Sequence, residues 1–415
     1  MSTPPLSAAA KFRVCATALL LVSVFVHARD LATPGLLDAS GRIKGSDYMR
    51  LYVTGALAGA GRWKELYSAD AHVREAQRRI DPGIRMSGLH PNYGPLTGVM
   101  LAPLARFPFL TSYALFCAAS VALLLLAAAV LVRHTSNLRS QRGVVLVCAA
   151  ASPALFESLR YGQLSAFSAM LFALAAAAHG TGRPVLAGVA LSGLIFKPPL
   201  LVAPLAVLVL RRENRLVGGV LLGAIAQVLL VLPFAGAAAF GDWISVLAIQ
   251  ARTPEMVQGF PAEVHSVRGF LRLLGLSGVG LTAAFVASAA AIVAFTAYVW
   301  ARFSDWRPRW IALTLAAILA SPHLLTYDLL LLLVPIALAA DLLLDGVRAP
   351  WWVMPVLPAL YFASLVSPLL ARWTHVQYST LAMAVLLLWC GQALDGRPRP
   401  FPAAPASIRT PPAPG

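Results

Sequence analysis

Residues 111–132 read TSYALFCAASVALLLLAAAVLV, and no charged residue interrupts them. A helix of roughly 17–25 apolar residues crosses the hydrocarbon core of a membrane, which is about 30 Å thick. Inside that core only helices and closed barrels satisfy their own backbone hydrogen bonds. Arg133 follows the run directly, and Arg139 and Arg142 come soon after it. The stretch therefore predicts a transmembrane helix with a basic, cytoplasmic end.

Apolar runs of this kind recur along the whole chain. Of its 415 residues 59% are hydrophobic and only 12% are charged, whereas soluble domains carry about 25% charged residues. This composition excludes an ordinary soluble enzyme and predicts an all-α integral membrane protein. We expect about twelve transmembrane helices, at residues 12–28, 111–132, 143–158, 164–179, 184–196, 198–210, 216–234, 278–301, 310–320, 324–344, 351–367 and 376–389.

The net charge of +16 has three candidate explanations: nucleic-acid binding, orientation charges in cytoplasmic loops, or cations for an anionic substrate. We expect no nucleic-acid partner, because the chain has no basic soluble domain. When the N-terminus is placed in the cytoplasm, every alternate connection is basic and these connections carry most of the excess charge. The expected location is a bacterial inner membrane, with multiple spans and both termini cytoplasmic.

The predicted organisation is a single membrane domain at residues 1–394 and a disordered, Pro- and Arg-rich cytoplasmic tail at 395–415. The first outer loop, residues 29–110, should carry short surface helices at 47–60 and 69–79, and a re-entrant or interfacial segment at 94–108. A second outer loop is expected at residues 235–277.

Residues 184–210 are interrupted by Lys197-Pro198-Pro199 and fit either one long span or two short ones. A single span would place Arg211, Arg212 and Arg215 outside. Two short helices that meet at the prolines are therefore the prediction.

Polar residues concentrate at the outer ends of the predicted spans, where ionisable groups are costly and mark functional sites. Asp47 is either a carboxylate stabilised at a helix N-terminus or a general base that takes a proton from an acceptor hydroxyl. Lys197 is either a snorkelling side chain or a cation for a phosphate in a low-dielectric pocket. Arg160 and Arg268 could bind phosphate in the same way.

His323 follows Ser321-Pro322 at another outer end. On a continuous helix it would share a face with Tyr327 and partly with Asp328, although a structural histidine is the commoner case. We expect no metal site, because the chain contains neither HxxxH nor HExxH.

These motifs occur in a characteristic order: Gly45-Ser46-Asp47-Tyr48, His90-Pro91-Asn92-Tyr93, Tyr161-Gly162-Gln163, Lys197-Pro198, Ser321-Pro322-His323 and Tyr327-Asp328. In this order the chain resembles the polyprenyl-phosphate-mannose-dependent glycosyltransferases, glycosyltransferase family 87 of the GT-C superfamily. That family includes phosphatidylinositol mannoside mannosyltransferases. Two motifs depart from its pattern, since Gly94 stands where a proline is usual and Leu324 follows His323.

The resemblance implies a GT-C type multi-pass bundle that transfers a hexose, expected to be mannose, with inversion. The donor would be a polyprenyl-phosphate sugar, the acceptor a lipid or glycan at the extracytoplasmic face, and no cofactor is expected. It assigns the role of base to Asp47 and, with the charges above, donor-phosphate binding to Lys197, Arg160 and Arg268. The expected substrate-binding residues are Tyr48, His90, Tyr93, Gln163, His323, Tyr327 and Asp328.

Two other functions remain open at this point. A transporter of lipid-linked sugars or polyprenyl phosphate would need the same cations but no base. A purely structural membrane scaffold would not explain why the ionisable groups gather on one face.

Overall fold

The computed structural model describes residues 8–85, 92–252 and 261–392. In these ranges the chain forms helices and two isolated β-bridges, Leu37 with Ile43 and Val264 with Leu325. The all-α fold class is therefore confirmed. The tail predicted at residues 395–415 lies outside the described residues.

The helices of the first half are α1 (Ala8–Leu31), α2 (Tyr48–Gly59), η1 (Trp63–Glu65), α3 (Ala69–Arg79), α4 (Pro95–Leu101), η2 (Leu104–Arg106), α5 (Phe109–His134), η3 (Leu138–Gln141), α6 (Arg142–Ala150), α7 (Pro153–Tyr161), α8 (Ser165–Gly180), α9 (Pro184–Ser192), η4 (Gly193–Phe196) and α10 (Pro199–Leu210). Those of the second half are α11 (Asn214–Arg252), η5 (Pro261–Glu263), α13 (Val267–Leu273), α14 (Gly278–Arg302), α15 (Trp306–Leu319), η6 (Thr326–Leu332), α16 (Leu333–Leu344), α17 (Val356–Tyr361), α18 (Ala363–Thr374) and α19 (Tyr378–Gln392).

Five described helical segments are long and apolar enough to cross a membrane: Arg13–Leu31, Phe109–His134, Asn214–Arg252, Gly278–Arg302 and Thr326–Leu344. A further pair, Leu138–Ala150 and Pro153–Tyr161, is bent by 42° and counts as a sixth if it is one broken span. The protein is thus a membrane protein. The larger number of about twelve spans stays a prediction, because α8, α9, α10 and α19 are shorter apolar helices.

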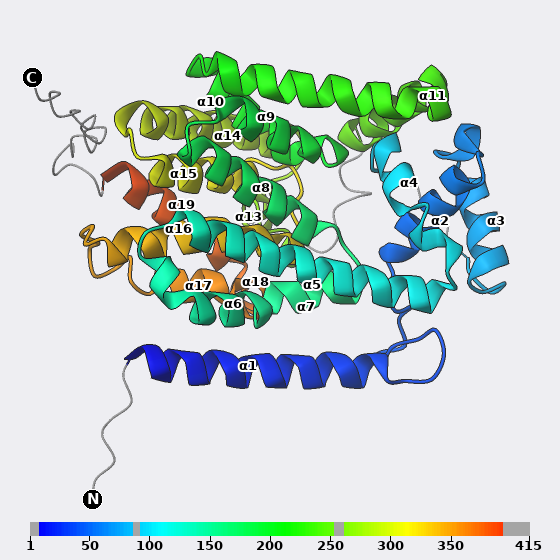
Figure 1. The fold of residues 1–415 in the computed structure, drawn as a ribbon, viewed down its shortest axis with the longest axis horizontal. Helices are drawn as coiled ribbons and strands as arrows, with labels where there is room; N and C mark the ends of the chain where they lie inside the picture. Colours follow the sequence, from blue (N-terminus) through cyan, green and yellow to red (C-terminus); the bar gives the residue numbers. More distant parts are fainter. Residues whose placement is uncertain (1–7, 86–91, 253–260, 393–415) are drawn as a thin grey trace, which may run out of the picture.

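The long helices run side by side along one direction, and α2, α3 and α4 gather at one end of the bundle (Figure 1). We call this the loop end. Helix α1 begins at the opposite end and α19 finishes there, so the chain enters and leaves the bundle on the same side (Figure 1).

Residues 184–210 form two helices, as expected. Helix α9 ends at Ser192 and the chain continues as η4 to Phe196, and α10 begins at Pro199. Lys197 stands between them with non-helical backbone angles of φ −130° and ψ 71°, because the proline ring that follows disfavours the helical conformation. The break therefore places a lysine at the turn between two apolar helices.

Helices α9 and α11 pack with unusually close backbones. A Cβ atom at Gly188 would lie 2.0 Å from the Leu216 carbonyl oxygen, and one at Gly219 would lie 2.2 Å from that of Val185. Only glycine permits this approach. This contact holds α9, the helix that leads towards the Lys197 turn, against α11.

Helix α2 differs from its predicted place on the surface, because nearly all of its residues are buried. It packs against α4 through Gly55, where a Cβ would lie 2.6 Å from the Leu101 carbonyl oxygen. A helix that is apolar all round is stable only when it is covered on every side. Helix α3 begins as predicted, with Ser68 accepting a hydrogen bond from the Ala71 backbone at 3.3 Å.

The second outer loop is predicted at residues 235–277, but the structure differs in the first part of this range. Residues 235–252 belong to helix α11, which continues to Arg252. The helix breaks direction at Gly236, whose φ of +70° is left-handed, shortly after Pro233. Both residues explain the break, because proline removes a helical hydrogen bond and glycine adopts positive φ without strain.

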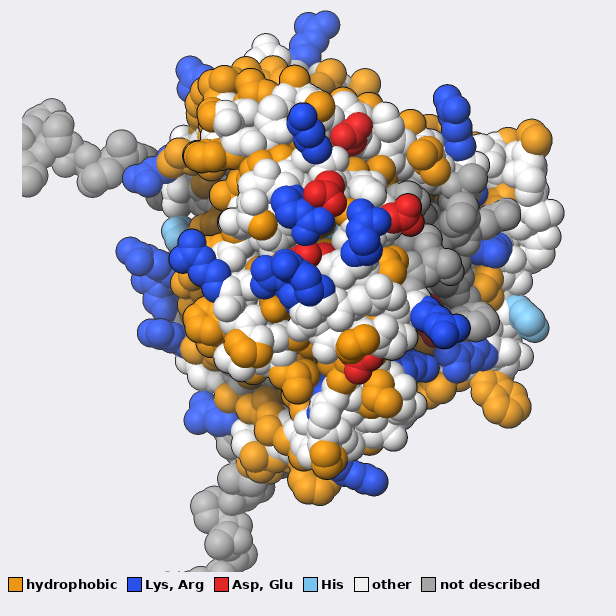
Figure 2. All heavy atoms as spheres, turned by 90° about the vertical axis from the view of Figure 1, so that its right-hand side faces the viewer, with side chains coloured by type: hydrophobic (Ala, Val, Ile, Leu, Met, Phe, Trp, Pro, Cys, Tyr) orange, Lys and Arg blue, Asp and Glu red, His pale blue; other side chains and the backbone are white. Residues whose placement is uncertain are grey.

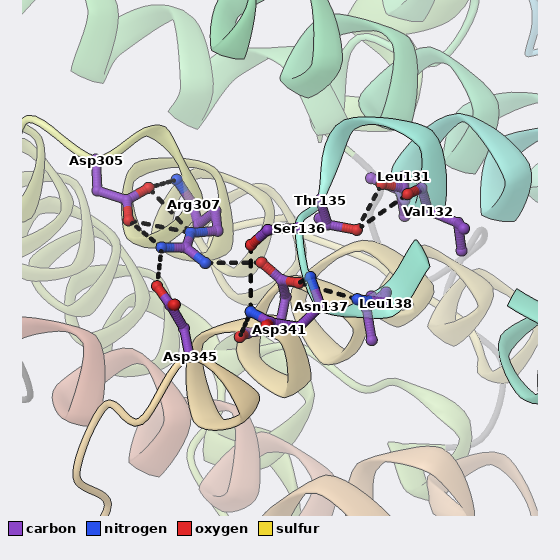
Figure 3. A network of polar contacts seen from close by, with 10 residues as sticks. All are labelled: Leu131, Val132, Thr135, Ser136, Asn137, Leu138, Asp305, Arg307, Asp341 and Asp345. Carbon is purple, nitrogen blue, oxygen red and sulfur yellow. Dashed lines mark hydrogen bonds and ion pairs between the residues drawn. The ribbon is translucent and has the colours of Figure 1, made fainter. Parts of the chain in front are cut away.

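A charged network (Figure 3) holds the helices together where α5 and α16 end, which is opposite the loop end (Figure 1). Arg307 on α15 contacts Asp341 at 2.7 Å, Asp345 at 3.0 Å and Asp305 at 2.7 Å. Asp341 also accepts a hydrogen bond from the backbone N–H of Asn137 at 2.9 Å. The network thereby joins α15, α16 and the turn that follows α5.

Candidate active site

A cavity of about 830 Å³ opens at the loop end. Its walls come from α2, α7, the Lys197 turn, η6, α18 and the last part of α11. Viewed from this end, basic and acidic side chains gather near the middle of the face (Figure 2). Most of the sequence-predicted site residues line this cavity, namely Asp47, Tyr93, Arg160, Gln163, Lys197, His323, Tyr327 and Asp328.

Asp47 occupies the N-cap position of α2 but makes no capping hydrogen bond with that helix. Its Oδ2 atom instead accepts a hydrogen bond from Gln163 Nε2 at 2.6 Å. The Gln163 amide is oriented by Tyr93, whose hydroxyl donates to Gln163 Oε1 at 2.8 Å. A chain of two hydrogen bonds therefore holds one oxygen of Asp47 and leaves the carboxylate at the cavity wall.

The backbone places Gln163 beside Asp47. Gly162 ends α7 in the left-handed conformation, with φ +76°, and a Cβ there would lie 2.3 Å from the Tyr48 Cβ. The Asp47 backbone N–H donates to the Tyr161 carbonyl at 2.9 Å. Two motifs that are far apart in sequence thus dock directly, and glycine is required at the contact.

Lys197 and Asp328 form a buried ion pair. Lys197 Nζ lies 2.6 Å from both Asp328 carboxylate oxygens. Ser165 Oγ donates to Asp328 Oδ1 at 2.9 Å, and the exposed fraction of the Asp328 side chain is 2%. The lysine also lies 5.6 Å from the centre of the Tyr327 ring. A buried carboxylate is stable here because a cation and a hydroxyl satisfy it.

The family model described as glycosyltransferase family 87 matches residues 92–326, which is more than half of the chain. The chain belongs to glycosyltransferase family 87. Within this family 87 protein the match includes Tyr93, Gln163, Lys197 and His323, whereas Asp47 precedes it and Asp328 follows it. No curated protein and no solved structure matches the chain.

The other two predicted phosphate cations of this family 87 protein lie in different surroundings. Arg160 lines the cavity, donates to Ser40 at 3.1 Å and lies 3.7 Å from both Asp30 and Asp38. Arg268 is on α13, with its guanidinium 5.8 Å from the centre of the Phe285 ring, and is not part of the cavity lining. The structure therefore brings Arg160, but not Arg268, to the other site residues.

Tyr48 also lies outside the cavity lining. It is completely buried, its hydroxyl is 2.6 Å from Ser112 Oγ, and its ring packs 4.6 Å from that of Phe116. Burial raises the pKa of its phenol to about 12. Tyr48 packs against Gly162, and this contact is suited to holding the neighbouring Asp47 in position. His90 lies outside the described residues.

His323 lines the cavity as a half-buried side chain. Residues 321–325 are not helical and η6 begins at Thr326, so the helix face that we expected His323 to share with Tyr327 and Asp328 is absent. His323 reaches the cavity from this loop, whereas Tyr327 and Asp328 reach it from the start of η6. Burial, and next the charge of Lys197, lowers the pKa of His323 to about 4. The imidazole is therefore neutral near pH 7.

In the described part of the chain there is no cluster of three or more His, Cys, Asp or Glu side chains that could hold a metal ion. The cavity does contain carboxylates at Asp47, Glu157, Glu263 and Asp328. Glu263 is paired with Arg372 at 3.0 Å. Three of the four carboxylates thus belong to separate polar contacts in the wall: Asp47 with Gln163, Asp328 with Lys197, and Glu263 with Arg372.

Sequence reasoning did not select several polar residues that line the cavity, among them Arg42, Arg50 and Gln250. Gln250, near the end of α11, donates a hydrogen bond to the Asn92 side chain. This bond joins α11 to the segment before α4, which is far away in sequence. Arg50 follows Asp47 by one helical turn, and this spacing was the signal that could have identified it.

Proposed function

We propose that this glycosyltransferase transfers a hexose, mannose in the first instance, from a polyprenyl-phosphate sugar to a lipid or glycan acceptor. The observation that carries the proposal is the Asp47 carboxylate, which Gln163 and Tyr93 orient at the wall of a cavity that also contains Lys197. The proposed location of the cavity is the extracytoplasmic face of a bacterial inner membrane, with both chain termini in the cytoplasm.

In the proposed reaction Asp47 acts as general base. Its carboxylate takes the proton of the acceptor hydroxyl while the hydroxyl oxygen bonds to the anomeric carbon. The bond between that carbon and the donor phosphate oxygen breaks, and the polyprenyl phosphate leaves with the electron pair. A single displacement of this kind inverts the anomeric centre, as in inverting glycosidases.

The remaining cavity residues have proposed roles in binding. Lys197 and Arg160 supply positive charge near the leaving phosphate, where a fixed charge in a low-dielectric site is most effective. Tyr93, Gln163, His323, Tyr327 and Asp328 would shape the sugar and acceptor sites. Their arrangement around one cavity supports these roles.

The test is transfer by the purified full-length protein in liposomes, with a radiolabelled polyprenyl-phosphate mannose and candidate lipid acceptors. We expect a glycoside product with inverted configuration. Asp47→Asn should reduce the rate by about 10²–10⁴-fold, the range typical of a lost general base, with normal expression and thermal stability. Full activity of Asp47→Asn would contradict the assignment of the base.

The alternative function, transport of lipid-linked sugars or polyprenyl phosphate, needs no base. Movement of labelled donor between leaflets without glycoside product, equally fast in wild type and in Asp47→Asn, would favour the transporter. The orientation of the Asp47 carboxylate by Gln163 favours the glycosyltransferase over the transporter, because transport of the lipid does not require a general base.

A further inference from the structure

The cavity is lined by five cationic side chains, Arg42, Arg50, Arg160, Lys197 and Arg372. Lys197 is paired with Asp328 at 2.6 Å, and Arg372 with Glu263 at 3.0 Å. Arg160 lies 3.7 Å from two carboxylates and Arg42 lies 3.5 Å from a tyrosine hydroxyl. Most of these cations therefore already have a partner in the wall.

Arg50 differs from them. In the described part of the chain its Nε atom is buried without a hydrogen-bond partner and no ion pair of its side chain is found, although the residue as a whole is half-buried. A charged donor that is removed from water without an acceptor is costly. Such an atom in the wall of a cavity calls for an anionic ligand that completes its hydrogen bonds.

The position of Arg50 fits the donor phosphate. It lies one turn after Asp47 on α2, where its backbone N–H donates to the Asp47 carbonyl at 3.2 Å, yet no ion pair between the two side chains is found in the described contacts. Its charge acts on the hydroxyls of Tyr93 and Tyr327, which belong to the same cavity. The cation and the base therefore face one substrate site.

We propose that Arg50 is the main ligand of the phosphate group of the lipid-linked sugar donor, an inference that rests on the proposed function. A guanidinium binds two phosphate oxygens at once, and it stabilises the charge that the leaving phosphate gains in the transition state. Lys197 is less suited to this role. To bind phosphate it would have to leave Asp328, a carboxylate with 2% of its side chain exposed, without its cation.

The first test compares Arg50→Gln, Arg50→Lys and wild type in the full-length protein, reconstituted in nanodiscs of phosphatidylcholine. The expected result is a donor KM about tenfold higher or more in Arg50→Gln, a smaller rise in Arg50→Lys, and an unchanged acceptor KM. The matched control is Arg106→Gln, which removes an exposed arginine of the loop end outside the cavity. Equal donor KM values in all four proteins would overturn the proposal.

The second test measures binding without transfer, by thermal stabilisation with a short-chain polyprenyl monophosphate, and with inorganic phosphate as the probe for the phosphate group alone. Wild type and Arg106→Gln should bind the lipid phosphate, and Arg50→Gln should lose about tenfold or more in affinity. Unchanged affinity in Arg50→Gln would overturn the proposal even if wild type transfers sugar.

The two proposals can fail separately. If binding depends on Arg50 but wild type transfers no sugar, the phosphate site stands and the proposed function fails. If inorganic phosphate binds as strongly as the lipid phosphate, Arg50 still binds phosphate but the polyprenyl chain adds nothing to recognition, which contradicts the lipid-linked donor.

Discussion

At the scale of single residues, the hydrogen-bond and ion-pair partners of a charged side chain decide which role it can have. Asp47 stands at a helix N-terminus, where a carboxylate commonly caps the helix, yet it accepts its hydrogen bond from Gln163 in the turn between α7 and α8. Lys197 could have been a snorkelling lysine, yet it binds both oxygens of Asp328. Both side chains have polar partners from distant parts of the chain.

The Lys197–Asp328 pair makes a prediction about stability. Lys197→Met keeps the length of the side chain but leaves the Asp328 carboxylate buried without a cation. Loss of one partner of a buried pair typically costs about 3–5 kcal/mol. We therefore expect a clear drop in the melting temperature in detergent, together with weaker donor binding and little change in acceptor binding.

The double variant Lys197→Met/Asp328→Asn is the control for this prediction. It removes the stranded carboxylate as well and should recover part of the lost stability. If Lys197→Met melts at the wild-type temperature, the ion pair does not stabilise the fold.

His323 predicts a dependence of stability on pH. Burial and the charge of Lys197 lower its pKa from 6.5 to about 4 in the folded protein. Between about pH 6.5 and pH 4 the unfolded chain binds a proton at this residue that the folded protein does not. The free energy of unfolding should therefore fall as the pH falls through this window.

Melting temperatures at pH 7, 6 and 5 test this dependence. We expect His323→Gln to weaken the decline towards pH 5, whereas His134→Gln, at an exposed histidine, should leave it as in wild type. Identical declines in wild type and His323→Gln would contradict the lowered pKa.

At the scale of elements, local sequence predicted most helices but not how closely they pack. The breaks at Lys197-Pro198 and at Gly162 follow from proline and glycine, whose backbone preferences are local. The burial of α2 and the continuation of α11 to Arg252 were not predicted, because both depend on which neighbours cover the helix.

The contact between α9 and α11 can be tested with two adjacent glycines. Gly219→Ala would place a Cβ 2.2 Å from the Val185 carbonyl oxygen, whereas a Cβ at Gly218 has no atom within 4 Å. Overpacking of this kind typically costs about 1–3 kcal/mol. Thermal unfolding in detergent should show that Gly219→Ala is destabilised.

Gly218→Ala is the matched control. It should be as stable as wild type or slightly more so, since alanine favours a helix over glycine by about 0.5–1 kcal/mol. Equal melting temperatures for the two variants would mean that α9 and α11 pack less closely than described.

At the scale of the whole molecule, the bundle separates a site at the loop end from a structural network at the opposite end. Arg307, Asp341 and their partners join three parts of the chain in that network (Figure 3). Because none of these residues lines the cavity, they should affect stability without affecting substrate binding.

Asp341→Asn tests this separation. Asp341 is completely buried, and its carboxylate contacts Arg307 at 2.7 Å, whereas the exposed fraction of the Asp345 side chain is 30%. We expect a larger loss of thermal stability in Asp341→Asn than in Asp345→Asn, because an ion pair with a buried carboxylate contributes more than one with a partly exposed carboxylate. The donor KM should be unchanged in both variants, and a changed KM would contradict the separation.

The amino-acid sequence by itself determined the membrane class, the all-α fold and the helix breaks at Lys197-Pro198 and Gly162, because apolar length and the effects of proline and glycine act locally. It also indicated Asp47, Gln163 and Lys197 as polar residues at span ends. Only the tertiary structure decided that Gln163 binds Asp47, that Lys197 pairs with Asp328, and that Arg50 lies in the cavity wall without an acidic partner. Residues more than a hundred positions apart meet there, and spacing along the chain does not specify which helices become neighbours.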